Sequence, residues 1–264
     1  MINRVNTIRE KKSKGKSLLY LISLAVLIGV SYYQFILETK NDRLVAWLFY
    51  NVQTLYTVLF GIPLLFMIYL TIELEFPIKK YMFLVRLGGR KQLFLTDFSF
   101  LLKLLFRFFI CLLLMVIVIG LPTQKQYFSW DKELIDYYTS VLKIVPNTQV
   151  APLIQVCFAW SFFFLYLFFI ANSYLLLTFV SKNRAVAFLI LFFFIGIQAY
   201  FYKLSQDTLV SDWLPFTHYL LYTGTEPVRN FSSLVLKNLR YWGLSLMIID
   251  GILFYCYTHK SVGE

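Results

Sequence analysis

Residues 71–108, TIELEFPIKKYMFLVRLGGRKQLFLTDFSFLLKLLFRF, separate two long apolar segments and are rich in positive charge. The basic side chains of this stretch are Lys79, Lys80, Arg86, Arg90, Lys91, Lys103 and Arg107. Positive charge between two apolar segments is typical of the cytoplasmic side of a membrane protein. The stretch therefore predicts a membrane protein and marks its inner face.

Part of this stretch, residues 77–91, predicts a short capped helix. Pro77 can open a helix, because its missing N–H lies where no intrahelical partner exists. A narrow apolar stripe at helical spacing follows, formed by Tyr81, Leu84, Val85 and Gly88. Gly88-Gly89 then favours the left-handed backbone that ends a helix. Two interpretations stay open: a helix that docks into a groove on a soluble partner, or a basic loop that only follows the positive-inside rule.

Composition favours a membrane protein over a soluble one. Hydrophobic residues make up 59% of the chain and charged residues 15%, whereas a soluble domain carries roughly 25% charged residues. A helix that crosses a bilayer needs about 20 apolar residues. Six segments qualify, so we expect one all-α, polytopic membrane domain. The expected transmembrane helices are 17–37, 44–70, 98–121, 152–179, 185–202 and 241–258.

The distribution of charge predicts the orientation of these six helices. Basic residues concentrate in 1–16, 71–97 and 182–184, which alternation places on one side of the membrane. Basic residues on the other side are nearly offset by acids. Both termini are therefore expected in the cytoplasm. The net charge of +11 is explained by this asymmetry, and we expect no nucleic-acid partner.

Three segments outside the expected spans carry further predictions. Residues 1–16 form a basic cytoplasmic connector, and no small-residue cleavage site follows 17–37, so this helix is expected to be a retained anchor. Residues 122–149 predict an amphipathic helix stopped by Pro146, either flat at the outer interface or a substrate lid. Residues 203–240 contain two apolar pieces too short to cross, which predicts interfacial or re-entrant half-helices.

Polar side chains within the expected spans are candidates for a translocation path. The outer half of the second span contains Asn51, Gln53, Thr54 and Thr57. These residues either bond other helices or face a path for substrate. Asp250 is the one acid well inside a span, with either a structural hydrogen bond or a proton or substrate role. In the fourth span, Asn172 and Ser173 are expected to bond across helices.

The residues that usually form catalytic or metal sites are sparse. The histidines, His218 and His259, fall in an outer segment and at the inner end of the last span, so neither a metal site nor a His-based dyad is expected. Cys111, Cys157 and Cys256 lie in apolar runs and are expected to be reduced and buried. We therefore expect no catalytic residue, no cofactor, no metal and no enzymatic activity in this chain.

The architecture resembles that of the type-2 (ABC-2) exporter permeases of ATP-binding-cassette transporters. Six spans, a long basic loop with RLGGRKQ at 86–92, a brief turn at 181–184 and a broken outer segment with LPFTHYLL at 214–221 all match that pattern. Arg86-Leu87-Gly88-Gly89-Arg90-Lys91 is similar to the R-L-G-S-R-K sequence common in permeases of Gram-positive peptide and bacteriocin exporters.

The resemblance implies where partners bind. In the family, the loop between spans two and three forms a coupling helix that inserts into the ATPase. Carried over, the residues at that contact are Tyr81, Leu84, Val85, Arg86, Leu87, Gly88, Gly89 and Arg90. Lys182, Asn183 and Arg184 would form a weaker second contact. The implied partners are a cytoplasmic ATPase dimer, a second permease chain of the same or a paralogous kind, and the lipid bilayer of a Gram-positive plasma membrane.

The implied function is export driven by ATP hydrolysis on a separate chain. The resemblance suggests an amphipathic peptide, such as a toxin or bacteriocin, as cargo, and lipid-linked glycans and drugs stay open. A non-transporting immunity or sensor subunit of such a complex is the alternative, because it would share the fold and the ATPase.

Overall fold

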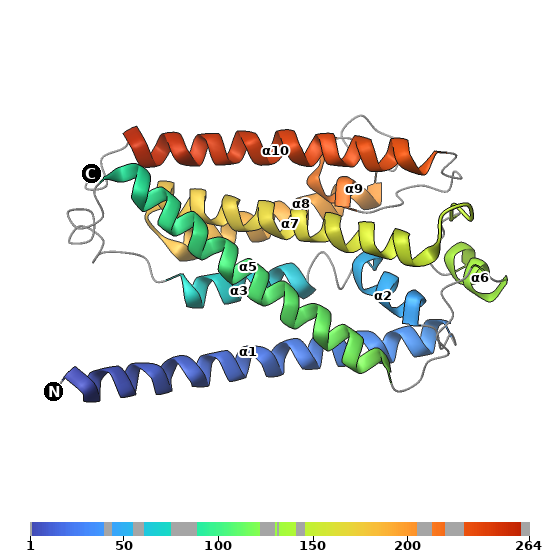
Figure 1. Cartoon of the computed structure of the whole chain (residues 1–264), viewed down its shortest axis with the longest axis horizontal. Helices are drawn as coiled ribbons and strands as arrows, with labels where there is room; N and C mark the ends of the chain where they lie inside the picture. Colours follow the sequence, from blue (N-terminus) through green and yellow to red (C-terminus); the bar gives the residue numbers. More distant parts are fainter. Residues whose placement is uncertain are drawn as a thin grey trace.

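The computed structural model describes residues 2–39, 44–54, 61–74, 89–121, 130, 132–140, 146–204, 213–219 and 230–259, and these are almost entirely helical, with no strand among them. The expected all-α class is therefore confirmed. The helices, labelled in Figure 1, are α1 (Ile2–Thr39), α2 (Leu44–Gln53), α3 (Ile62–Glu73), α5 (Arg90–Gly120), α6 (Lys132–Ser140), α7 (Pro152–Ser181), α8 (Arg184–Leu204), α9 (Pro215–Tyr219) and α10 (Phe231–His259).

Four helices of the described chain are long and apolar enough to cross a membrane. They are Tyr20–Glu38 of α1, together with α5, α7 and α10. Their outward faces carry large exposed apolar side chains such as Val26, Leu114 and Met247. Extensive exposed apolar surface of this kind suits contact with lipid and is unusual for a soluble monomer. The chain is therefore built as a membrane protein.

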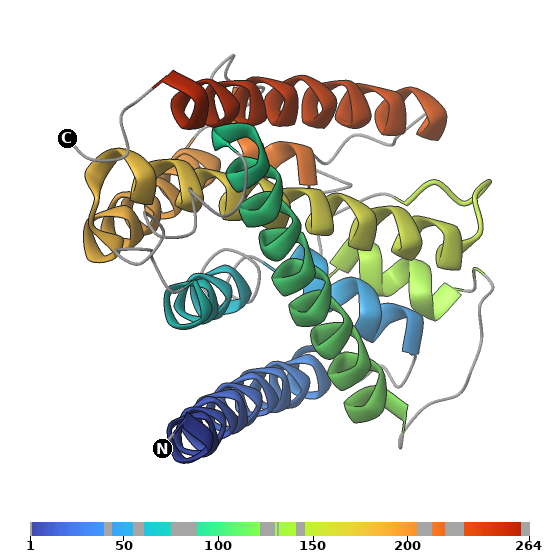
Figure 2. The same ribbon diagram turned by 60° about the vertical axis from the view of Figure 1, so that its left-hand side comes forward.

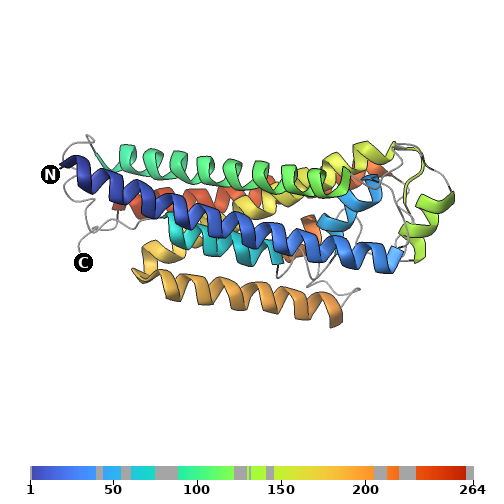
Figure 3. The same cartoon turned by 90° about the horizontal axis from the view of Figure 1, so that it is seen from below.

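The helix α7 lies at the centre of the bundle. It packs against α2, α3, α5, α8, α9 and α10. Figure 2 shows α5 crossing in front of α7, from α10 at one end to α1 at the other. Seen from below in Figure 3, α8 lies on the outside of the bundle, where it contacts α3 and α7. The core thus forms around one long apolar helix.

The expected span 44–70 is not one kinked helix. The helix α2 ends at Gln53 and α3 begins at Ile62, while residues 55–60 lie outside the described part. Pro63 is in the first turn of α3. This position suits proline, because its missing N–H costs nothing there but breaks a hydrogen bond in a helix interior. Neither helix alone is long enough to span a bilayer.

The short helix α2 is buried on every side. All of its residues from Val45 to Gln53 are buried. The indole Nε1–H of Trp47 donates to the carbonyl oxygen of Val116 on α5 at 2.7 Å. The indole Nε1–H of Trp160 on α7 donates to the carbonyl oxygen of Leu48 at 3.1 Å. A helix without a polar face belongs in a core, and these bonds place α2 between α5 and α7.

Several helices extend beyond the expected boundaries. The expected spans starting at 98 and 241 begin at Arg90 and Phe231. One of the two short apolar pieces expected within 203–240 is residues 228–236. Most of it is the start of α10 and not a separate half-helix. The expected connector 1–16 is continuous with the first span, since α1 runs unbroken from Ile2. Hydropathy marks only the apolar part of a helix, so it does not predict the polar turns at the helix ends.

Two small helices, α6 and α9, pack against the longer helices through aromatic contacts. On α6, the buried ring of Tyr138 lies 4.8 Å from Phe49 and 5.3 Å from Trp130. On α9, the ring of Tyr219 lies 4.8 Å from Tyr166, which is near the middle of α7. This depth favours the re-entrant alternative for α9 over an interfacial one.

A glycine on α5 allows the close approach of α2. A Cβ atom at Gly120 would overlap the indole of Trp47, lying 2.7 Å from its Nε1. We expect Gly120→Ala to destabilise the fold by about 1–3 kcal/mol, because the indole would be pushed from its bond to Val116. The measurement is thermal unfolding of the purified chain in detergent, followed by circular dichroism.

Gly251→Ala on α10 is the matched control, because nothing lies within 4 Å of its added Cβ. We expect it to be neutral, or to stabilise by up to about 1 kcal/mol through helix propensity. Equal loss of stability in both variants would contradict the importance of the Trp47 contact.

Candidate functional site

The basic segments of the described chain gather at one end of the bundle. The helix α1 begins, α5 begins, α7 turns into α8, and α10 ends at the end drawn on the left of Figure 1. Of the predicted ATPase contacts, Gly89 and Arg90 lie there, as do Lys182–Arg184. The predicted contacts Tyr81, Leu84, Val85, Arg86, Leu87 and Gly88 lie outside the described residues.

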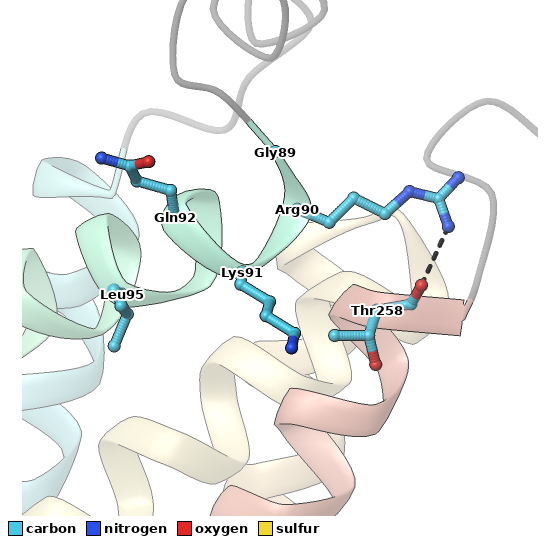
Figure 4. A pocket seen from close by; sticks show the side chains of 6 residues that line it. All are labelled: Gly89, Arg90, Lys91, Gln92, Leu95 and Thr258. Carbon is cyan, nitrogen blue, oxygen red and sulfur yellow. Dashed lines mark hydrogen bonds between the residues drawn. The ribbon is translucent and has the colours of Figure 1, made fainter.

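The base of α5 is fixed to the end of α10. Gly89 precedes α5 with a φ of 140°, a backbone conformation that favours glycine. The guanidinium Nη1 of Arg90 donates to the carbonyl oxygen of Thr258 at 3.0 Å (Figure 4). Two turns further along α5, the carboxylate of Asp97 accepts a hydrogen bond from the hydroxyl of Tyr257 at 2.9 Å. These two contacts join the first turns of α5 to the last turns of α10.

The turn between α7 and α8 is held by its own side chains. Lys182 has a left-handed backbone with a φ of 54°. The side-chain oxygen of Asn183 accepts a hydrogen bond from the backbone N–H of Ala185 at 2.9 Å, which caps the start of α8. The guanidinium of Arg184 donates to the carbonyl oxygen of Thr71 at 3.2 Å. The turn is thereby connected to the end of α3, the helix that precedes the predicted coupling segment.

Two candidates for the translocation path form internal hydrogen bonds in α2. The amide nitrogen of Asn51 donates to the carbonyl oxygen of Trp47 at 2.8 Å, and its oxygen accepts from the hydroxyl of Ser31 at 3.5 Å. The hydroxyl of Thr54 donates to the carbonyl oxygen of Tyr50 at 2.7 Å. These bonds favour the helix-packing interpretation for Asn51 and Thr54.

Gln53 differs from its neighbours on α2. It is only 8% exposed, yet neither side-chain amide atom has a hydrogen-bond partner in the described structure. It therefore stays a candidate for contact with a substrate. Thr57, the last member of the group, lies outside the described residues.

Two further polar side chains, one on α7 and one on α10, also have unpartnered atoms in the described structure. Asn172 is fully buried, and neither atom of its amide has a partner among the described residues. The expected cross-helix bond of Asn172 is therefore wrong. Asp250 is half-buried, and its Oδ1 also has no partner there.

Aromatic contacts show that Asn172 and Asp250 lie at similar depth. The ring pairs Phe169–Trp242 and Phe179–Tyr257 lie on either side of them along α7 and α10, at 6.1 and 4.9 Å. The similar depth of these two unpartnered polar groups could not be predicted from the sequence, because it does not show how α7 and α10 align.

His218 is a structural residue in this bundle. It is buried, its Nδ1 lies 3.0 Å from the side-chain oxygen of Asn238, and its ring stacks on Tyr241 at 3.7 Å. Its carbonyl oxygen accepts the indole N–H of Trp242 at 3.0 Å. These contacts fix α9 against α10.

Within the described residues, no group of three His, Cys, Asp or Glu side chains could hold a metal ion. The cysteines are free, but only Cys256 is buried; Cys111 is half-buried and Cys157 is exposed, so the expected burial is wrong for Cys157 and only partly right for Cys111. Cys157 lies on the outward face of α7. In a membrane helix an apolar position can face lipid as readily as the core, so an apolar run does not predict burial.

Comparisons of the chain with family models, with curated proteins and with solved structures found no match. The resemblance to exporter permeases therefore rests on the architecture and on the sequence 86–91. The function that follows from it is a proposal.

The lack of a hydrogen-bond partner for Asn172 among the described residues should lower the stability of the fold by a measurable amount. We expect Asn172→Leu to stabilise the fold by about 1–3 kcal/mol, because it removes a buried amide that forms no hydrogen bond. Asn51→Leu is the matched control, and it should destabilise by about 1 kcal/mol, because both of its amide atoms are bonded. Thermal unfolding of both variants in detergent is the measurement. A loss of stability in Asn172→Leu as large as that in Asn51→Leu would show that Asn172 is bonded in the protein.

Proposed function

We propose that this chain is the membrane subunit of an ATP-binding-cassette exporter of the ABC-2 type. It would cross the membrane six times with both termini in the cytoplasm, and would pair with a second permease chain. A separate ATPase dimer would bind at the basic end. The proposed cargo is an amphipathic peptide, which suits membrane helices rich in aromatic side chains and poor in charge.

The observation that carries the proposal is the position of Gly89 and Arg90. They belong to the family-like sequence Arg86–Lys91, and Arg90 begins a 31-residue helix, α5, that is apolar enough to span the membrane. A force applied to residues 77–91 would therefore act on the end of a long rigid rod. The second proposed contact, 182–184, lies at the same end of the bundle (Figure 1).

The contacts of α5 and α3 suggest how such a force would spread. Arg90 and Asp97 attach α5 to the end of α10. Arg184 attaches the α7–α8 turn to Thr71, at the end of α3. When ATP closes the ATPase dimer, the coupling segment between α3 and α5 would shift, and the bundle would rearrange between two packings. No catalytic group in this chain is needed for that step.

Residues of the predicted coupling segment provide the direct test. We expect Leu84→Asp or Arg86→Asp to release the ATPase, because each places a carboxylate in a contact proposed to be apolar and basic. The measurement is the amount of ATPase that co-purifies with the tagged chain from its native cells. Lys237→Asp, an exposed position near the opposite end of α10, is the matched control and should retain the ATPase.

Retention of the ATPase by both Leu84→Asp and Arg86→Asp would contradict the assigned contact. Absence of any ATPase from the wild-type preparation would contradict the proposed function. Transport of a labelled amphipathic peptide into inverted vesicles, with and without ATP, separates an exporter from an immunity or sensor subunit, which would bind the ATPase but move no peptide.

The contact between α5 and α10 has its own test. We expect Tyr257→Phe to leave the ATPase bound but to reduce ATP-driven transport about tenfold. The variant removes a hydrogen bond to a carboxylate, a type of bond that contributes about 1.5–3 kcal/mol, and each 1.4 kcal/mol is a factor of ten. The measurement compares co-purification with transport in the same vesicles. Loss of ATPase binding in this variant would place Tyr257 in the docking surface instead.

A further inference from the structure

We propose that a groove between the start of α5 and the end of α10 binds the phosphate headgroup of an anionic phospholipid. The groove has a volume of about 610 Å³, within the range of roughly 300–1,000 Å³ that small-molecule sites occupy. Its lining, drawn in Figure 4, is Gly89, Arg90, Lys91, Gln92, Leu95 and Thr258.

The positive charge of the groove favours an anionic ligand. Two of the lining side chains are cationic, and none of the described residues that line the groove is acidic. Lys91 is exposed and forms no ion pair with any described residue. Arg90 uses one guanidinium nitrogen for the carbonyl oxygen of Thr258, which leaves further N–H donors for a phosphate oxygen. The bond to Thr258 also holds the guanidinium at the edge of the groove.

The position of the groove and the apolar surface beside it favour a lipid over free phosphate. The groove lies at the ends of two candidate membrane helices, where headgroups are found. Leu95 in its lining is 61% exposed, and Tyr255, one turn before Thr258, is 60% exposed. Leu95 thus offers apolar contact for an acyl chain in the same groove as the two cations. Basic pockets between membrane helices on the inner face bind anionic headgroups in this way.

This inference goes beyond the proposed function and does not require it. A headgroup in the groove would contact Gly89 and Arg90, at the base of the predicted coupling segment. The lipid would then bridge the starting turn of α5 and the last turn of α10, beside the direct bond between Arg90 and Thr258. Binding of the lipid can be measured on the chain alone, with no ATPase present.

The experiment measures which lipids stay with the purified chain. The chain is incorporated into nanodiscs of phosphatidylcholine with a minor fraction of phosphatidylglycerol, transferred to detergent, and examined by native mass spectrometry. We expect phosphatidylglycerol to be retained in preference to phosphatidylcholine. Lys91→Gln should lower that retention about fivefold, since one basic side chain near a surface contributes about 1 kcal/mol to binding an anionic lipid.

A second variant and a control complete the test. Leu95→Asp keeps both cations but places a carboxylate in the groove, and we expect it to abolish the preference for phosphatidylglycerol. Lys182→Asn removes an exposed charge at the same end but outside the groove, and should bind lipid as the wild type does. Asparagine also tolerates the left-handed backbone of that position. Unchanged circular dichroism is required of each variant.

Three outcomes would overturn the proposal. The first is equal retention of both lipids by the wild type. The second is an equal loss in Lys182→Asn, which would assign the effect to the general charge of this end. The third is displacement of the lipid by inorganic phosphate alone, which would assign the groove to a soluble anion.

Discussion

Two indole hydrogen bonds place the helix on which the rest of the bundle depends. Trp47 on α2 reaches the backbone of α5, and Trp160 on α7 reaches the backbone of α2. A buried indole N–H without an acceptor is costly, especially where no water is available. The two bonds therefore fix the depth and rotation of a helix too short to span a bilayer by itself. Gly120 allows α5 to approach closely enough for the first of them.

The two ends of the bundle are built differently. At the basic end, side chains bond the last carbonyl groups of neighbouring helices, as Arg90 does at Thr258 and Arg184 does near the end of α3. Cations are favourable at helix C-termini, because the helix dipole is negative there. At the other end, α6 contacts α2 through the rings of Tyr138 and Phe49. The basic end is thus held by directional bonds between helix termini, and the opposite end by contacts between aromatic rings.

The positions of long apolar helices could be predicted from the sequence. The expected helix 152–179 matches α7 because nearly all of its side chains are apolar. The start of α5 was placed too late, because residues 90–97 are polar enough to resemble a loop. The pairings Arg90–Thr258 and Tyr257–Asp97 join residues more than 150 positions apart, so local patterns carry no sign of them. For the same reason, Asn172 was expected to be bonded, since no local pattern shows which residue it faces.

The length of α1 has a mechanical meaning of its own. Its 38 residues form a rod of about 57 Å at 1.5 Å per residue. A bilayer with its headgroups is about 40–45 Å thick. An upright rod of that length must protrude by several turns, and its apolar part, Tyr20–Glu38, is at the far end from the basic turns. A sideways force on the basic turns would then tilt the part of the same helix that lies inside the membrane.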